Sequence, residues 1–202
     1  MVRRACPSRL LAMLGLACAV AAAHAQNPET SASSSPAASV LFASGDARVH
    51  RATGAAPLTR GAPIGWGDAI VTGADGKLQM RLSEGAMLSL QPGSQFELTS
   101  ARAARQPLRL LFGAGTLRWT GKALPPDVPG IELHTQRAVI EVRGATFSAA
   151  YNADGSVNIA TERDPLQICT RAGCITLTDD GAVRVRSDDV VPTQTNARAT
   201  FR

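Results

Sequence analysis

The sequence contains few of the side chains on which nucleic-acid binding and catalysis depend. Its 202 residues include three histidines and eight aromatic residues, namely two Trp, one Tyr and five Phe. The aromatic residues do not interleave with a basic run, whereas nucleic-acid-binding surfaces combine clustered basic residues with aromatic rings that stack on bases. The composition therefore excludes nucleic acid as a partner.

Long apolar runs are absent except at the N-terminus. The run Leu10–Ala23 is too short for a comfortable membrane span, and Ala23-His24-Ala25 matches the small-x-small pattern of signal peptidase cleavage. A positive segment precedes the run, formed by Arg3, Arg4 and Arg9. The pattern predicts a signal peptide over residues 1–25, export to the periplasm and no membrane span after cleavage.

Two alternatives to a cleaved leader fit the sequence less well. An uncleaved anchor is disfavoured because the cleavage site is good. Lipidation at Cys18 is disfavoured because Gly15 stands where a leucine is expected. Removing the three leader arginines from 21 basic residues leaves 18, against 16 acidic ones, so the mature net charge is +2 rather than +5.

Cysteine is scarce in the predicted mature chain, which retains only Cys169 and Cys174 of the four cysteines. Four residues including a glycine separate them, and apolar residues flank both. This spacing predicts a hairpin that brings the two Cβ atoms near disulfide distance, and an oxidising compartment favours the bond. A C-x4-C pair without a nearby His or third Cys is a poor zinc site, and it is not the C-x-x-C of thiol oxidoreductases.

No catalytic or metal-binding constellation is evident. His50 and His134 are far apart in sequence, and Ser94 lies in a Pro-Gly-Ser turn rather than in a G-x-S-x-G elbow. The pairs Asp179-Asp180 and Asp188-Asp189 offer fewer oxygen ligands than the about six to eight that calcium takes. We therefore expect no enzyme, no cofactor and no metal, although a glycosidase-like pair of convergent carboxylates stays open at this stage.

The residue pattern predicts an all-β fold. Lys77–Leu82 alternates polar and apolar residues without a break, and turn residues recur every ~8–12 positions. The predicted organisation is a Ser/Ala/Pro-rich linker over 26–39, a β domain over 40–186 and a polar tail over 187–202. A Pro-rich stretch over 123–130 is expected to form a hinge-like loop that divides the domain into two halves.

Three segments in order resemble the FecR domain family. They are GWGDAIVTGADGKLQMRLSEGAMLSLQPGS over residues 65–94, LLFGAGTLRW over 110–119, and TQRAVIEVRGATF over 135–147. The resemblance covers roughly residues 40–160. The family-motif turns fall on Gly67, Asp68, Thr72, Gly76, Gly85, Arg143 and Gly144.

The resemblance implies an exported, non-catalytic β domain, built as a short-strand solenoid-like stack or a sandwich. Signalling members of the family add a segment that contacts a sigma factor and a transmembrane helix. We find neither pattern here, so we expect an accessory in periplasmic sensing or envelope assembly that binds an envelope protein. The alternative is a structural or adhesive module that binds an anionic envelope polymer through Arg102, Arg105 and Arg109.

Overall fold

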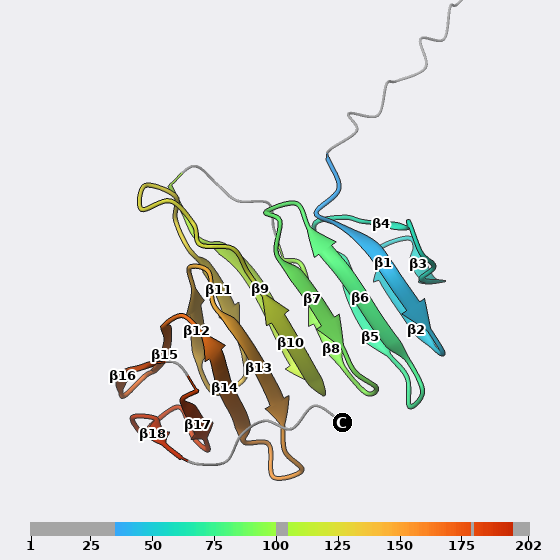
Figure 1. Cartoon of the computed structure of the whole chain (residues 1–202). Helices are drawn as coiled ribbons and strands as arrows, with labels where there is room; N and C mark the ends of the chain where they lie inside the picture. The colour runs from blue at the N-terminus through green and yellow to red at the C-terminus, as the bar shows by residue number, and fades with distance from the viewer. Residues whose placement is uncertain (1–34, 100–104, 179, 196–202) are drawn as a thin grey trace, which may run out of the picture. The chain divides into compact units, whose positions relative to one another are not determined.

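The described part of the chain consists of β-strands and their connections. The computed structural model describes residues 35–99, 105–178 and 180–195, and in these residues it contains eighteen strands and no helix (Figure 1). Consequently, no helix in these ranges is long and apolar enough to cross a membrane. The expected leader, residues 1–25, lies outside the described residues.

The strands form two sheets of nine strands each. From edge to edge, sheet 1 contains β18 (Thr193–Gln194), β17 (Ala182–Val185), β14 (Val157–Arg163), β13 (Thr146–Tyr151), β10 (Thr116–Thr120), β7 (Met87–Leu90), β6 (Lys77–Leu82), β1 (Ala38–Ser44) and β4 (Pro63–Ile64). Sheet 2 contains β16 (Gly173–Leu177), β15 (Leu166–Thr170), β12 (Val139–Val142), β11 (Ile131–His134), β9 (Leu108–Ala114), β8 (Gln95–Glu97), β5 (Ala69–Thr72), β2 (Ala47–Arg51) and β3 (Gly54–Pro57).

Strand order within each sheet almost follows the chain. From β5 onward the chain passes back and forth between the sheets, usually leaving two strands in one before it crosses to the other. Among the described strands the neighbours are antiparallel except β9 and β11. This progression is typical of a solenoid-like stack, and it confirms the expected all-β architecture.

The core lies between the two sheets. In β6, Leu78, Met80 and Leu82 are at most 2% exposed, whereas Lys77 and Arg81 point to solvent. The rings of Trp119 and Phe147, both fully buried, stack at 6.1 Å between centroids. Burial of each such large apolar side chain contributes about 1.5–3 kcal/mol, so the alternating pattern is the main source of stability.

The strands extend beyond the expected limits of the β domain at both ends. Strand β1 begins at Ala38, inside the expected linker, because Ala37 and Ala38 are buried against the core. Strand β18 lies inside the expected polar tail and pairs with β17. The short strands β3 and β4 were not expected, since glycine and proline there indicate turns.

The Pro-rich loop 123–130 does not divide the domain into two halves, so that prediction was wrong. Strand β10, before the loop, pairs with β13, after it. Likewise β9 pairs with β11. Both sheets are therefore continuous across the loop, which only carries the chain from sheet 1 to sheet 2.

The predicted disulfide between Cys169 and Cys174 is present. The two residues lie directly opposite each other in the β15–β16 hairpin, with 4.0 Å between their Cα atoms. The hairpin turn consists of Arg171 and Ala172. The bond therefore ties the last two strands of sheet 2 together.

Candidate functional site

The first family-motif turn carries a buried carboxylate. Asp68 is 6% exposed, and its Oδ2 accepts hydrogen bonds from the Gly65 N–H at 2.8 Å and from the Arg51 Nε at 2.9 Å. Gly67 before it has φ 85° and donates its N–H to the Leu98 carbonyl. The sequence-based interpretation of Asp68 as a turn cap is thus confirmed, and Arg51 neutralises its charge.

Thr72 is the centre of a second buried network. Its Oγ1 donates to the Gln91 carbonyl at 2.7 Å and accepts the Ser94 N–H at 2.8 Å. Ser94 is fully buried, and its Oγ accepts the Thr116 N–H at 3.1 Å. Ser94 is therefore a structural turn residue that joins the two sheets, and its hydroxyl is not positioned as a nucleophile.

Gly76 and Gly85 lie in the turns before and after β6. Gly76 donates to the Gly73 carbonyl at 3.1 Å, and Gly85 donates to the Leu82 carbonyl at 2.9 Å. Gly85 has φ 90°, a conformation that favours glycine. Both turns reverse the chain, and the two motif glycines have no side chain that could take part in chemistry.

Arg143 holds the Pro-rich loop in place. Its Nη2 donates to the carbonyls of Pro125, Pro126 and Val128, at 3.1, 3.3 and 3.0 Å. The adjacent Gly144 leaves no room for a side chain, since a Cβ there would lie 2.7 Å from the Ala123 Cα. The Arg-Gly motif therefore fixes the crossing between the sheets.

In the described part of the chain, the arginines of the predicted anion patch do not form a cluster. Arg102 lies outside the described residues, and Arg105 is exposed at the start of the segment leading to β9, with φ 62°. Arg109 projects from β9, and its Nε lies 3.2 Å from the Glu132 Oε2. The charge of Arg109 is thus partly neutralised within the domain.

His50 and His134 lie on the outer face of sheet 2. His134 Nε2 lies 2.9 Å from the Glu132 Oε2. His50 belongs to the same cross-strand row, four strand spacings away, or roughly 19 Å. Among the described residues, no group of three or more His, Cys, Asp or Glu side chains could hold a metal ion.

A two-sheet stack that carries these motif turns in this order can be compared with known proteins. Residues 68–164 match the family model described as FecR protein. These residues are a FecR domain. A comparison with curated proteins found no significant match.

Two crystal structures share the fold of the FecR domain. Both are of a putative anti-sigma factor from Parabacteroides distasonis, at 1.65 and 2.50 Å resolution. Each has a TM-score of 0.55 and 15% sequence identity, over 65% of this chain and 60% of the other. The chain therefore spans less than two thirds of those structures, and the likeness concerns the fold.

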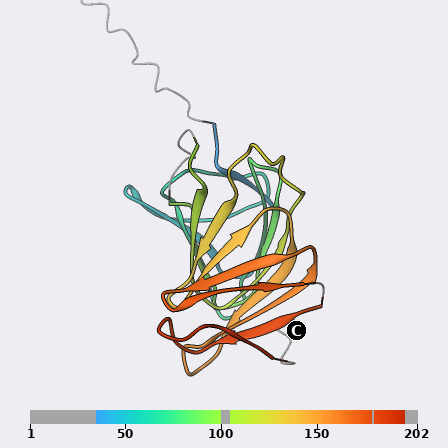
Figure 2. The same ribbon diagram turned by 90° about the vertical axis from the view of Figure 1, so that its left-hand side faces the viewer.

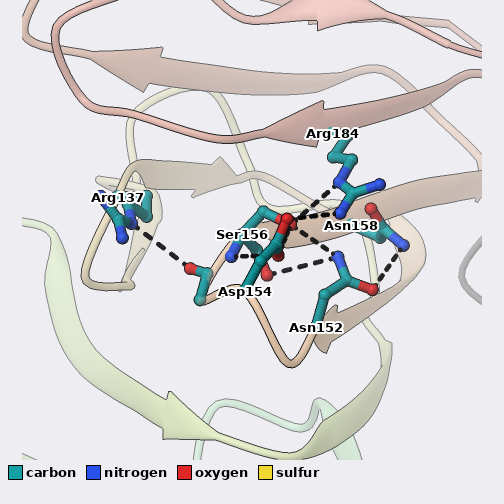
Figure 3. Close-up of polar contacts among 7 residues, drawn as sticks. Arg137, Asn152, Asp154, Ser156, Asn158 and Arg184 are labelled. Carbon is teal, nitrogen blue, oxygen red and sulfur yellow. Dashed lines mark hydrogen bonds and ion pairs between the residues drawn. The ribbon is translucent and has the colours of Figure 1, made fainter.

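A polar cluster closes the β13–β14 hairpin of the FecR domain. The Asp154 Oδ1 accepts the Ser156 N–H at 3.0 Å and the Ser156 hydroxyl at 2.5 Å, and its Oδ2 accepts from the Arg184 Nη2 at 2.7 Å. Asn152 donates to the Ser156 hydroxyl at 2.9 Å. Figure 3 shows these side chains pointing toward one another, with Arg137 reaching the Gly155 carbonyl from the β11–β12 turn. The contacts join β13, β14 and β17, which gives the cluster a structural role.

The cluster makes a pH-dependent contribution to stability. Hydrogen bonds from Ser156, and then the charge of Arg184, lower the pKa of Asp154 from 3.8 to about 2. A lowered pKa in the folded state gives stabilisation that is complete above pH ~3.8 and is lost as the pH falls toward 2.

We expect Ser156→Ala to raise the pKa of Asp154 by removing the hydroxyl donor, as measured by a carboxyl-carbon NMR titration. An unchanged titration would contradict this, and Ser83→Ala on an exposed turn is the control.

Proposed function

We propose that the chain is an exported, non-catalytic FecR-domain protein that binds another protein of the cell envelope, as an accessory in periplasmic signalling. The observation that carries the proposal is the FecR match over residues 68–164 on a two-sheet stack. Members of this family are regulatory or signalling proteins rather than enzymes. The structural neighbours described as anti-sigma factors support the same class of role.

The distribution of polar side chains supports binding rather than chemistry. Asp68, Thr72 and Ser94 all use their side-chain oxygens for contacts that fix turns. Arg143 is bonded to loop carbonyls, and Arg109 is paired with Glu132. These side chains stabilise the two-sheet stack, so we expect a function to reside on the surfaces and edges of the stack.

The test is cross-linking of a tagged copy in its native cells, followed by mass spectrometry. One recurrent envelope protein is the expected result, together with a mature N-terminus at Gln26. Recovery only with cell-wall or polysaccharide fragments would contradict the proposal and favour the polymer-binding alternative. A copy lacking residues 1–25 is the control, because it is expected to stay inside the cell and to lose the partner.

A further inference from the structure

The two sheets have four edge strands, and three of them are blunted. Strands β4 and β18 contain two residues each. Strand β3 ends with Pro57, which has no N–H to donate. Strand β16, Gly173–Leu177, has five residues without a proline or a charge. Short edges, prolines and charges are the usual protection against strand addition, and β16 lacks all three.

The backbone N–H and C=O groups of β16 that point away from its neighbour β15 belong to Cys174 and Thr176. In an antiparallel hairpin with a two-residue turn, Thr170 and Gly173 form the hydrogen-bonded pair next to the turn. Cys169 and Cys174 are then a non-hydrogen-bonded pair, in keeping with their close Cα spacing of 4.0 Å. The N–H and C=O groups of Cys174 and Thr176 therefore point away from β15. No hydrogen bond joins them to another residue in the described ranges, and both residues are exposed.

The chain segment that contacts the turn of the β15–β16 hairpin leaves the outward backbone groups of β16 open. The Asp188 carbonyl accepts the Arg171 N–H at 2.9 Å, and the Val190 carbonyl accepts the Thr170 hydroxyl at 3.0 Å. These contacts brace the hairpin from its turn and do not use the outward groups of β16. Figure 2 views this end of the β domain, with the orange and red C-terminal strands toward the viewer.

A pocket of about 420 Å³ adjoins the open edge on the outer face of sheet 2. Thr176 of β16, Gln167 of β15 and Glu141 of β12 lie side by side across the strands and form one wall. Asp164 and Arg143 contribute to the rest of the lining. Within the described part of the chain, neither Glu141 nor Asp164 forms an ion pair, whereas Arg143 is bonded to loop carbonyls. The pocket thus offers two unpaired carboxylates to a ligand.

We propose that β16 binds an extended segment of a partner protein by strand addition, and that a Lys or Arg side chain of this segment enters the adjoining pocket. The added strand forms main-chain hydrogen bonds with Cys174 and Thr176, which provide affinity without sequence preference. The basic side chain passes over Thr176 toward Glu141 and provides specificity by charge complementarity. The disulfide keeps β16 in place as a template. This inference rests on the proposed function and names the surface through which it acts.

The first test uses defined peptides and the purified chain. The probes are capped seven-residue peptides Thr-Val-Thr-X-Thr-Val-Thr in which X is Lys, Gln or Glu. We expect saturable binding, with shifts of the Cys174 and Thr176 amide signals in NMR spectra. The Lys peptide is expected to bind about tenfold more tightly than the Glu peptide, because only Lys complements the two carboxylates. No saturable binding of any of the peptides, or equal affinity for all three, would overturn the proposal.

Two substitutions separate the edge from the pocket. Thr176→Pro removes an outward N–H but leaves the β15–β16 hydrogen bonds, so binding of every peptide should be lost while the disulfide still forms. Thr176→Val retains the N–H and is its control. Glu141→Gln should reduce the preference for Lys and leave the Gln peptide unaffected. Glu97→Gln, on β8 of the same face, is the matched control and should change nothing.

The cellular experiment distinguishes this inference from the function on which it rests. If the cross-linked partner is recovered with the parent chain but not with Thr176→Pro, both stand. If both chains recover it equally, the proposed function stands and the β16 inference fails. If a concentration-dependent dimer is seen in sedimentation and is abolished by Thr176→Pro, the occupant of the edge is a second copy, and the inference also fails.

Discussion

Replacement of Gly76 by alanine is expected to destabilise the FecR domain by about 1–3 kcal/mol, the usual cost of overpacking a well-packed site. A Cβ at this position would lie 2.1 Å from the Asp46 carbonyl oxygen and 2.9 Å from the Gly73 N. Both are backbone atoms, and the Asp46 carbonyl already accepts the Gly73 N–H at 2.7 Å. The turn before β6 and the turn between β1 and β2 would have to separate. The midpoint of unfolding in urea measures the loss.

Gly113→Ala is the matched control for Gly76→Ala. Gly113 lies in β9, and a Cβ added there would meet Gln95 side-chain atoms no closer than 3.6 Å, which is ordinary contact. Alanine there should leave the free energy of unfolding within about 0.5 kcal/mol of the parent or raise it slightly, because the unfolded chain loses freedom. Equal losses at Gly76 and Gly113 would show that the cost at Gly76 does not come from close packing of the two turns.

The alternating residues and the cysteine spacing allowed the fold class and the disulfide to be predicted. Lys77–Leu82 alternates because one side faces the core, and that relation is local. The spacing of Cys169 and Cys174 sets the hairpin directly, since the two residues are only five positions apart. Both inferences need no knowledge of which strands are neighbours.

Features that depend on non-local pairing could not be predicted. The Pro-rich loop looked like a boundary because its composition is that of a linker, yet β10 pairs with β13 across it. The pairing of Arg109 with Glu132 needs the parallel register of β9 and β11, which no local pattern specifies. The position of β16 at an edge could not be predicted, because Gly173–Leu177 lacks the charges and prolines that usually protect an edge strand, and a strand can be identified as an edge only once the sheet order is known.

Thr72→Val is expected to cost about 1–3 kcal/mol, although valine matches threonine in shape. The Thr72 Oγ1 accepts the Ser94 N–H at 2.8 Å, and Ser94 is fully buried. Without the oxygen, this N–H keeps its desolvation cost and has no acceptor, while the Gln91 carbonyl loses the hydrogen bond of 2.7 Å. No cavity forms, so the loss reports on hydrogen bonding alone, as measured by denaturant unfolding with an unchanged slope.

Thr120→Val is the control that separates the loss of the Thr72 hydrogen bonds from any general effect of replacing threonine by valine. Thr120 is exposed at the end of β10, where valine suits a strand and leaves no buried group without a partner. We expect its free energy of unfolding to stay within about 0.5 kcal/mol of the parent. If Thr72→Val is equally mild, a water molecule satisfies the Ser94 N–H, and the threonine of the FecR motif is replaceable. If it is severe, the Thr72 hydroxyl is needed to close the contact between the two sheets where β5, β8 and β10 meet.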